Sequence, residues 1–148
     1  MAENLQRQTQ NKPRLPFSVT LLALGVLIVA GIHLLRLFQT LQNWDFLAEL
    51  PGAPPIYLAL TGLVWAAAGF PLGITLWRGN PPALRSVRFI AVAYIIYDWL
   101  NRFFAAFLSG SLATGFAWGF SALLTVILLV WVFWTVSRPR VQAYFRRD

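Results

Sequence analysis

Long apolar runs are the feature that most constrains this chain. Four of them cover residues 17–38, 55–77, 83–108 and 112–136. Each is long enough to cross the hydrocarbon core of a membrane as a helix, which takes about 20 residues. Charged side chains make up only 11% of the chain, against about 25% of an average soluble domain. The sequence therefore predicts an all-α integral membrane protein, a bundle of four transmembrane helices, and excludes an ordinary cytosolic enzyme.

The polar segments lie at the two ends of this predicted transmembrane domain, which covers residues 17–136. Residues 1–16 are rich in Gln and Asn and are expected to form a disordered cytoplasmic tail. Residues 137–148 are expected to form a basic cytoplasmic tail. Three side chains of this tail are expected to touch the membrane surface: Val141, Tyr144 and Phe145.

The distribution of basic residues predicts the orientation of the chain. Ten of the twelve lie before the first run, between the second and third, or after the fourth: Arg7, Lys12, Arg14, Arg78, Arg85, Arg88, Arg138, Arg140, Arg146 and Arg147. Basic loops stay on the cytoplasmic side, so both ends of the chain are expected on the cytoplasmic side of the cell membrane. The net charge of +7 then reflects this topology and contact with anionic lipid headgroups, and binding to nucleic acid is not expected.

A weak internal similarity relates the two predicted helical hairpins. Thr61-Gly62-x-x-Trp65 in the second run corresponds to Thr114-Gly115-x-x-Trp118 in the fourth. Both halves start on the same side of the membrane, so a true duplication would be a parallel repeat. Matches this short also arise by chance in apolar sequences, and both explanations stay open.

A few ionisable and polar residues interrupt the first and third runs. These are His33 and Arg36 in the first, and Tyr94, Asp98, Asn101 and Arg102 in the third. Charges at this depth are costly and are expected to face protein and to pair. Counted from the inner ends of their helices, His33 and Asp98 both lie roughly 24–26 Å along, in the outer third of the membrane. We expect one buried polar cluster joining the two helices, in which Asp98 pairs with Arg102, His33 or Arg36.

Three roles are open for this cluster. It can hold two helices in register without any substrate. It can also be a proton or small-ion site, with Asp98 as the carrier and His33 or Arg102 tuning it. A third possibility is contact with a partner subunit.

The inventory of chemical groups favours neither a cofactor nor a catalytic site. The chain has no Cys and one His. Thiolate metal sites, disulfides and a self-contained bis-histidine haem are thereby excluded, and no metal site or catalytic residue is predicted.

Small residues at helical spacing predict close helix packing. They are the pairs Gly69-x-x-x-Gly73 and Gly115-x-x-x-Gly119, extended by Gly62. Such pairs let two helix backbones approach each other, within this bundle or in a homodimer. The expected function is that of a non-enzymatic accessory or interaction subunit, in a homo-oligomer or a larger membrane complex. The alternative is a small oligomeric proton- or ion-coupled transporter using His33, Asp98 and Arg102.

Overall fold

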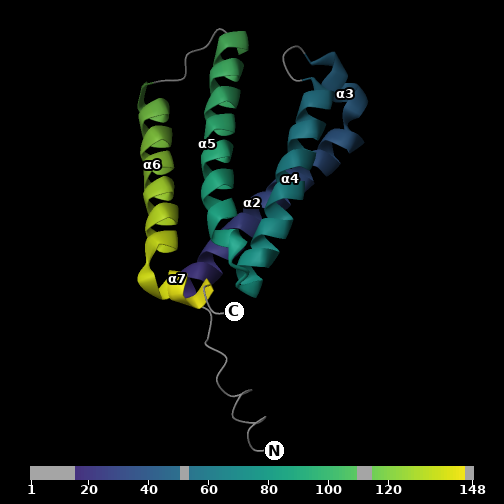
Figure 1. Cartoon of the computed structure of the whole chain (residues 1–148). Coiled ribbons are helices and arrows are strands. Elements are labelled where there is room, and N and C mark those ends of the chain that lie inside the picture. Colours follow the sequence, from purple (N-terminus) through teal and green to yellow (C-terminus); the bar gives the residue numbers. More distant parts are fainter. Residues whose placement is uncertain (1–15, 51–53, 110–114, 146–148) are drawn as a thin grey trace, which may run out of the picture.

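The chain folds into helices, as seen in a computed structural model that describes residues 16–50, 54–109 and 115–145. The helices are α2 (Phe17–Gln42), α3 (Trp44–Glu49), α4 (Pro55–Arg78), α5 (Pro82–Ser109), α6 (Gly115–Ser137) and α7 (Pro139–Phe145). Figure 1 shows α2 with α4, and α5 with α6, as two long hairpins. No strand occurs in these three ranges, so the predicted all-α class is confirmed.

Three of the long helices are apolar enough to cross a membrane. They are α2, α4 and the part of α6 from Ala117 to Ser137. Helix α5 is longer, with 28 residues, but its sequence carries four charged side chains that lower its hydropathy: Arg85, Arg88, Asp98 and Arg102. The protein is thus a helical membrane protein with three candidate spans among the described residues.

Helices α2 and α4 pack closely because glycines line the contact. A Cβ atom added at Gly69 would lie 2.7 Å from the Cβ atom of Ala30. One added at Gly73 would lie 2.5 Å from Cδ2 of Leu27, and one at Gly62 would lie 3.0 Å from the carbonyl oxygen of His33. Small residues therefore bring these two backbones together, as they do in other membrane helix pairs.

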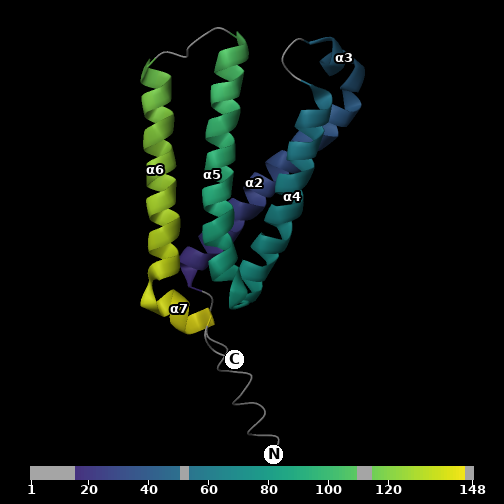
Figure 2. The same cartoon turned by 45° about the horizontal axis from the view of Figure 1, so that its top comes forward.

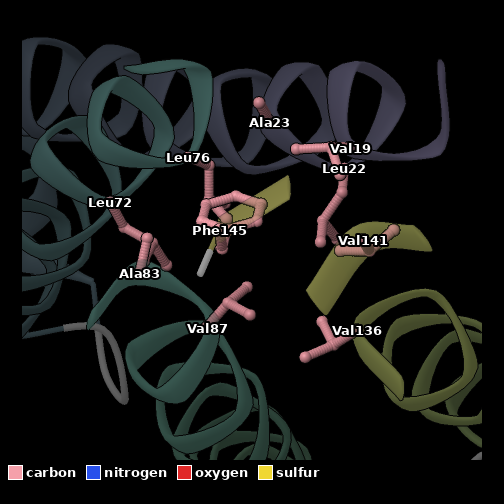
Figure 3. Packing of buried hydrophobic residues seen from close by; sticks show 10 residues of the cluster. All are labelled: Val19, Leu22, Ala23, Leu72, Leu76, Ala83, Val87, Val136, Val141 and Phe145. Carbon is pink, nitrogen blue, oxygen red and sulfur yellow. The ribbon is translucent and has the colours of Figure 1, made fainter. Parts of the chain in front are cut away.

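The main core lies at the end of the molecule where α7 folds back, which we name the α7 end. Figure 3 shows the buried side chains of all four long helices meeting those of α7 there. The cluster consists of Val19, Leu22, Ala23, Leu72, Leu76, Ala83, Val87, Val136, Val141 and Phe145. Val141 and Phe145 are only 1% and 2% exposed, so the expectation that they touch the membrane surface is wrong. Four residues apart on one short helix, they share the face that α7 turns towards the core.

Gly79 explains how α4 can end against α7. Its φ of 74° is in the left-handed region, and the turn is closed by a hydrogen bond from the N–H of Asn80 to the carbonyl oxygen of Thr75. A Cβ atom at Gly79 would lie 2.6 Å from Cε1 of Tyr144. Glycine is thus required here both for the backbone conformation and for the close approach of the tyrosine ring.

The two hairpins meet at the α7 end and diverge towards the opposite end. Figure 2, turned from the first view, shows the same divergence between α4 and α5. Helix α5 makes far fewer contacts with α4 than α2 does. The α2/α4 hairpin is therefore a tightly packed unit, and the α5/α6 hairpin is attached to it mainly at one end.

We expect Gly69→Ala to lower the free energy of unfolding by about 1–3 kcal/mol, because the new methyl group overlaps Ala30. Adding Ala30→Gly should restore much of that loss by removing the atom that the new methyl group meets. Gly31→Ala is the matched control, since a Cβ atom there has nothing within 4 Å. Unfolding by SDS in mixed micelles measures all three; equal losses for Gly69→Ala and Gly31→Ala would contradict this account of the packing.

Candidate functional site

Four ring side chains from three helices form a cluster in the middle of the bundle. His33 of α2, Trp65 of α4, and Tyr94 and Tyr97 of α5 lie with ring centroids 4.9–6.4 Å apart. The Tyr94 ring stands edge-on to both His33 and Trp65, an orientation that aromatic rings favour. We refer to these four residues as the aromatic cluster.

Hydrogen bonds connect α2 to α5 through the tyrosines of this cluster. His33 Nε2 lies 3.3 Å from the hydroxyl oxygen of Tyr94, and Nη1 of Arg36 donates to the Tyr97 hydroxyl at 3.4 Å. His33 is 5% exposed, and its Nδ1 has no hydrogen-bond partner within the described ranges. In an apolar surrounding such bonds are the main polar means of holding two helices in register.

A further bond connects α4 to the same side of α5. The hydroxyl of Tyr57 donates to Oδ1 of Asn101 at 3.1 Å. The predicted residue Asn101 therefore takes part in helix contact, with a partner that the sequence did not single out.

The only ion pair of the described residues lies within α5. Nε of Arg102 donates to Oδ2 of Asp98 at 2.7 Å, and Nη1 of Arg102 donates to the Ser121 hydroxyl of α6 at 3.0 Å. The side chains of Arg102 and Asp98 remain 46% and 33% exposed. This pair thus joins α5 to α6.

The structure divides the predicted polar cluster between two neighbouring faces of α5. His33 and Arg36 reach the tyrosines, and Asp98 binds Arg102. Each step of four residues turns a helix by about 40°, so two such steps carry the face from Tyr94 round to Arg102 by about 80°. Tyr94 therefore reaches His33 of the α2/α4 hairpin, and Arg102 reaches Ser121 of α6.

A further hydrogen bond relates α5 to α6 at the α7 end. Nη2 of Arg88 donates to the Ser137 hydroxyl at 3.4 Å, so Arg88 lies beside the last residue of α6. Asp98 is roughly 15 Å further along α5.

A cavity of about 270 Å³ lies beside the aromatic cluster, among all four long helices. Its walls are almost entirely apolar, and two glycines, Gly25 and Gly69, contribute to them. The polar exceptions are Trp65, Tyr94, Asp98, Thr125 and Trp131. The arrangement can therefore hold an apolar molecule and offer it polar contacts at Tyr94 and Asp98.

Two further observations bear on the predicted site residues. Over the described ranges, no three His, Asp or Glu side chains lie close enough together to hold a metal ion. The Gly115 and Gly119 pair differs from its counterpart in α4: α6 begins at Gly115, and a Cβ atom at Gly119 would have nothing within 4 Å. Among the described residues, no other helix therefore packs against Gly119 as α2 packs against Gly69 and Gly73.

Sequence reasoning missed Tyr57, Trp65, Tyr97 and Ser121. The available signal was weak: each is a polar or aromatic side chain in an apolar run, within reach of a helix that carries charge. Which neighbouring helix faces them depends on the crossing of the hairpins, which periodicity alone does not give.

Comparison of the chain with known protein families, with curated proteins and with solved structures found no significant match.

A double-mutant cycle tests the bond between His33 and Tyr94. We expect His33→Leu and Tyr94→Phe to show a coupling free energy of about 0.6–1.7 kcal/mol, between the average and the maximum found for hydrogen bonds between membrane helices. His33→Leu combined with Thr75→Val should be additive, because Thr75 bonds to carbonyl oxygens of its own helix. SDS-induced unfolding of the four proteins in each cycle supplies the free energies. A coupling near zero in the first cycle would mean that the contact does not stabilise the fold.

Proposed function

We propose that α5 is the fourth membrane span and that both ends of the chain lie in the cytoplasm of the cell membrane. Its 28 residues reach roughly 42 Å, and it lies beside α6 in both views (Figures 1 and 2). The Asp98–Arg102 pair lowers the cost of its two central charges.

The orientation is supported by basic residues at the α7 end. Arg78 ends α4, and Arg85 and Arg88 occupy the first two turns of α5. The guanidinium of Arg138 stacks 3.6 Å from the ring centroid of Trp134, and a Trp–Arg pair of this kind suits the interface with anionic headgroups.

Within that membrane we infer that the protein acts as a non-enzymatic interaction subunit, docking another copy of itself through α6. The observation that carries this proposal is the contrast between the two glycine pairs. Helix α2 packs against Gly69 and Gly73, and Gly119 faces open space. A glycine without a neighbour lets the helix of a second subunit approach its backbone.

The exposure of α6 supports the same surface. In its most apolar window 11% of residues are buried inside the chain, compared with 28% for α2 and for α4. Gly119 is turned roughly 120–180° around α6 from Thr125, Leu128 and Val132, which line the cavity. A second subunit on this face would leave the cavity free.

A single introduced cysteine tests the α6 contact, because the chain has none of its own. We expect Gly119→Cys, oxidised in native membranes, to give a disulfide-linked dimer, since two helices crossing there bring the thiols within bonding distance. Leu35→Cys, on an α2 side chain that is 61% exposed, is the control and should remain monomeric.

A bulky residue at the same place should separate the subunits. Gly119→Leu has room within the chain and should leave the monomer folded while abolishing the dimer in sedimentation experiments. A wild-type protein that sediments as a monomer, or equal cross-linking at both cysteine positions, would refute the proposal.

Proton- or ion-coupled transport is the second candidate, because Asp98 lies on the cavity wall. It is the weaker one, since Asp98 is already bound to Arg102 and His33 belongs to the aromatic cluster. If Asp98 carries a proton, Asp98→Asn should abolish proton-linked flux into proteoliposomes and leave the protein folded. We expect instead that wild-type and Asp98→Asn proteoliposomes show the same flux as empty liposomes.

A further inference from the structure

The cavity among the four long helices has the form of a narrow apolar slot. Along α5 its wall extends from Val87, in the core of the α7 end, to Asp98, a distance of roughly 16 Å. Its volume of about 270 Å³ is slightly below the roughly 300–1,000 Å³ of pockets for drug-sized ligands. Spread over this length, the volume corresponds to one hydrocarbon chain.

One end of the slot is polar and carries no net charge. Oδ2 of Asp98 is bound by Nε of Arg102, and Oδ1 of Asp98 and Nη2 of Arg102 make no hydrogen bond within the described ranges. Both side chains remain partly exposed. Asp98 lines the slot and Arg102 does not, so the end of the apolar slot presents a carboxylate with one free oxygen that Arg102 neutralises from outside the wall.

The neutrality of this end selects among possible head groups. A carboxylate or phosphate would be repelled by Asp98, and an ammonium group gains little from a carboxylate that Arg102 already neutralises. A hydroxyl can donate to the free carboxylate oxygen without bringing a charge into the slot. Hydrogen bonds to charged groups of this kind are stronger than those between neutral groups.

We propose that the slot binds a neutral single-chain lipid with a hydroxyl head, its chain in the cavity and its hydroxyl at Oδ1 of Asp98. The site lies on a different face of α6 from Gly119, so the proposal does not depend on the subunit contact. The closed end of the slot is the core of the α7 end, which supplies Leu22, Leu72 and Val87 to its walls.

Quenching of tryptophan fluorescence by a brominated lipid tests this site, because Trp65 and Trp131 line the cavity. The probe is a long-chain alcohol brominated at mid-chain, added to the full chain in phosphatidylcholine nanodiscs. We expect a saturable quenching component above the linear background that partition into the bilayer produces. Trp131→Phe should reduce its amplitude, and Trp77→Phe, which removes an exposed ring that does not line the cavity, should preserve it.

Filling the slot should abolish the saturable component. Gly25 lines the cavity, and a Cβ atom there has nothing within 4 Å, so Gly25→Leu adds a side chain to the wall of the slot at a position where its Cβ atom meets no neighbour. We expect the affinity to fall at least about tenfold, because the leucine and the ligand chain compete for the same volume. Gly31→Leu is the matched control: the same helix, the same open space, but no part in the cavity wall. Ala91→Leu is a second blocking variant, on the α5 side of the slot. Far-UV circular dichroism and thermal unfolding check that every variant is folded.

The head group is tested with two matched probes, the corresponding brominated carboxylic acid and brominated alkane. The alcohol should bind at least about tenfold more tightly than either, the factor expected for hydrogen bonds to charged groups. Equal binding of the alkane would overturn the role of the Asp98–Arg102 pair, and tighter binding of the acid would overturn the choice of a neutral head. A saturable component that survives both Gly25→Leu and Ala91→Leu, or no saturable component in the wild type, would overturn the site itself.

Discussion

The buried cluster at the α7 end is the interaction on which the rest of the structure depends. It is the one place where side chains from α2, α4, α5, α6 and α7 share a common core. Phe145 and Val141 lie between the hairpins there, so a seven-residue helix joins two units whose other contacts are the rings and hydrogen bonds that reach α5 from α2 and α4. The divergence of the hairpins and the cavity between them both follow from this attachment at one end.

The two hairpins are held together by different physical means. Within the α2/α4 hairpin, Gly69 and Gly73 allow backbone contact, and dispersion supplies the stability. Between that hairpin and α5, the contacts are hydroxyl hydrogen bonds from Tyr94 and Tyr97 and the edges of aromatic rings. Tyrosine rings are too large to allow backbones to meet, so the same side chains that connect α5 also keep it at a distance. The cavity lies in the space that this distance leaves.

Much of the fold could be predicted from the sequence, since length and hydropathy determine it. The apolar runs beginning at residues 17, 55 and 83 correspond to helices that start at Phe17, Pro55 and Pro82. Burial of α7 could not be predicted, because a short segment that contains Arg140 and is flanked by further arginines has the composition of a solvated tail. The site was predicted in part, because the sequence selected the charged residues of α2 and α5. Their partners depend on a rotation of about 40° for each four residues along a helix, which spacing alone does not resolve.

Pairing Asp98 with Arg102 of the same helix separates electrostatics from packing. Had Asp98 paired with Arg36 of α2, parting the hairpins would have left two unpaired charges among apolar helices, at a cost of several kcal/mol. With Arg102 as its partner, Asp98 stays neutralised whatever the position of α2 and α4. Away from the α7 end, hydrogen bonds to the tyrosines oppose separation, each contributing about 0.6 kcal/mol on average. One of these bonds comes from Arg36, whose guanidinium would lose Tyr97 as a partner if the hairpins parted. The polar end of the cavity is therefore a property of the α5/α6 hairpin alone, and Arg36 is the charge that a wider slot would leave without this partner.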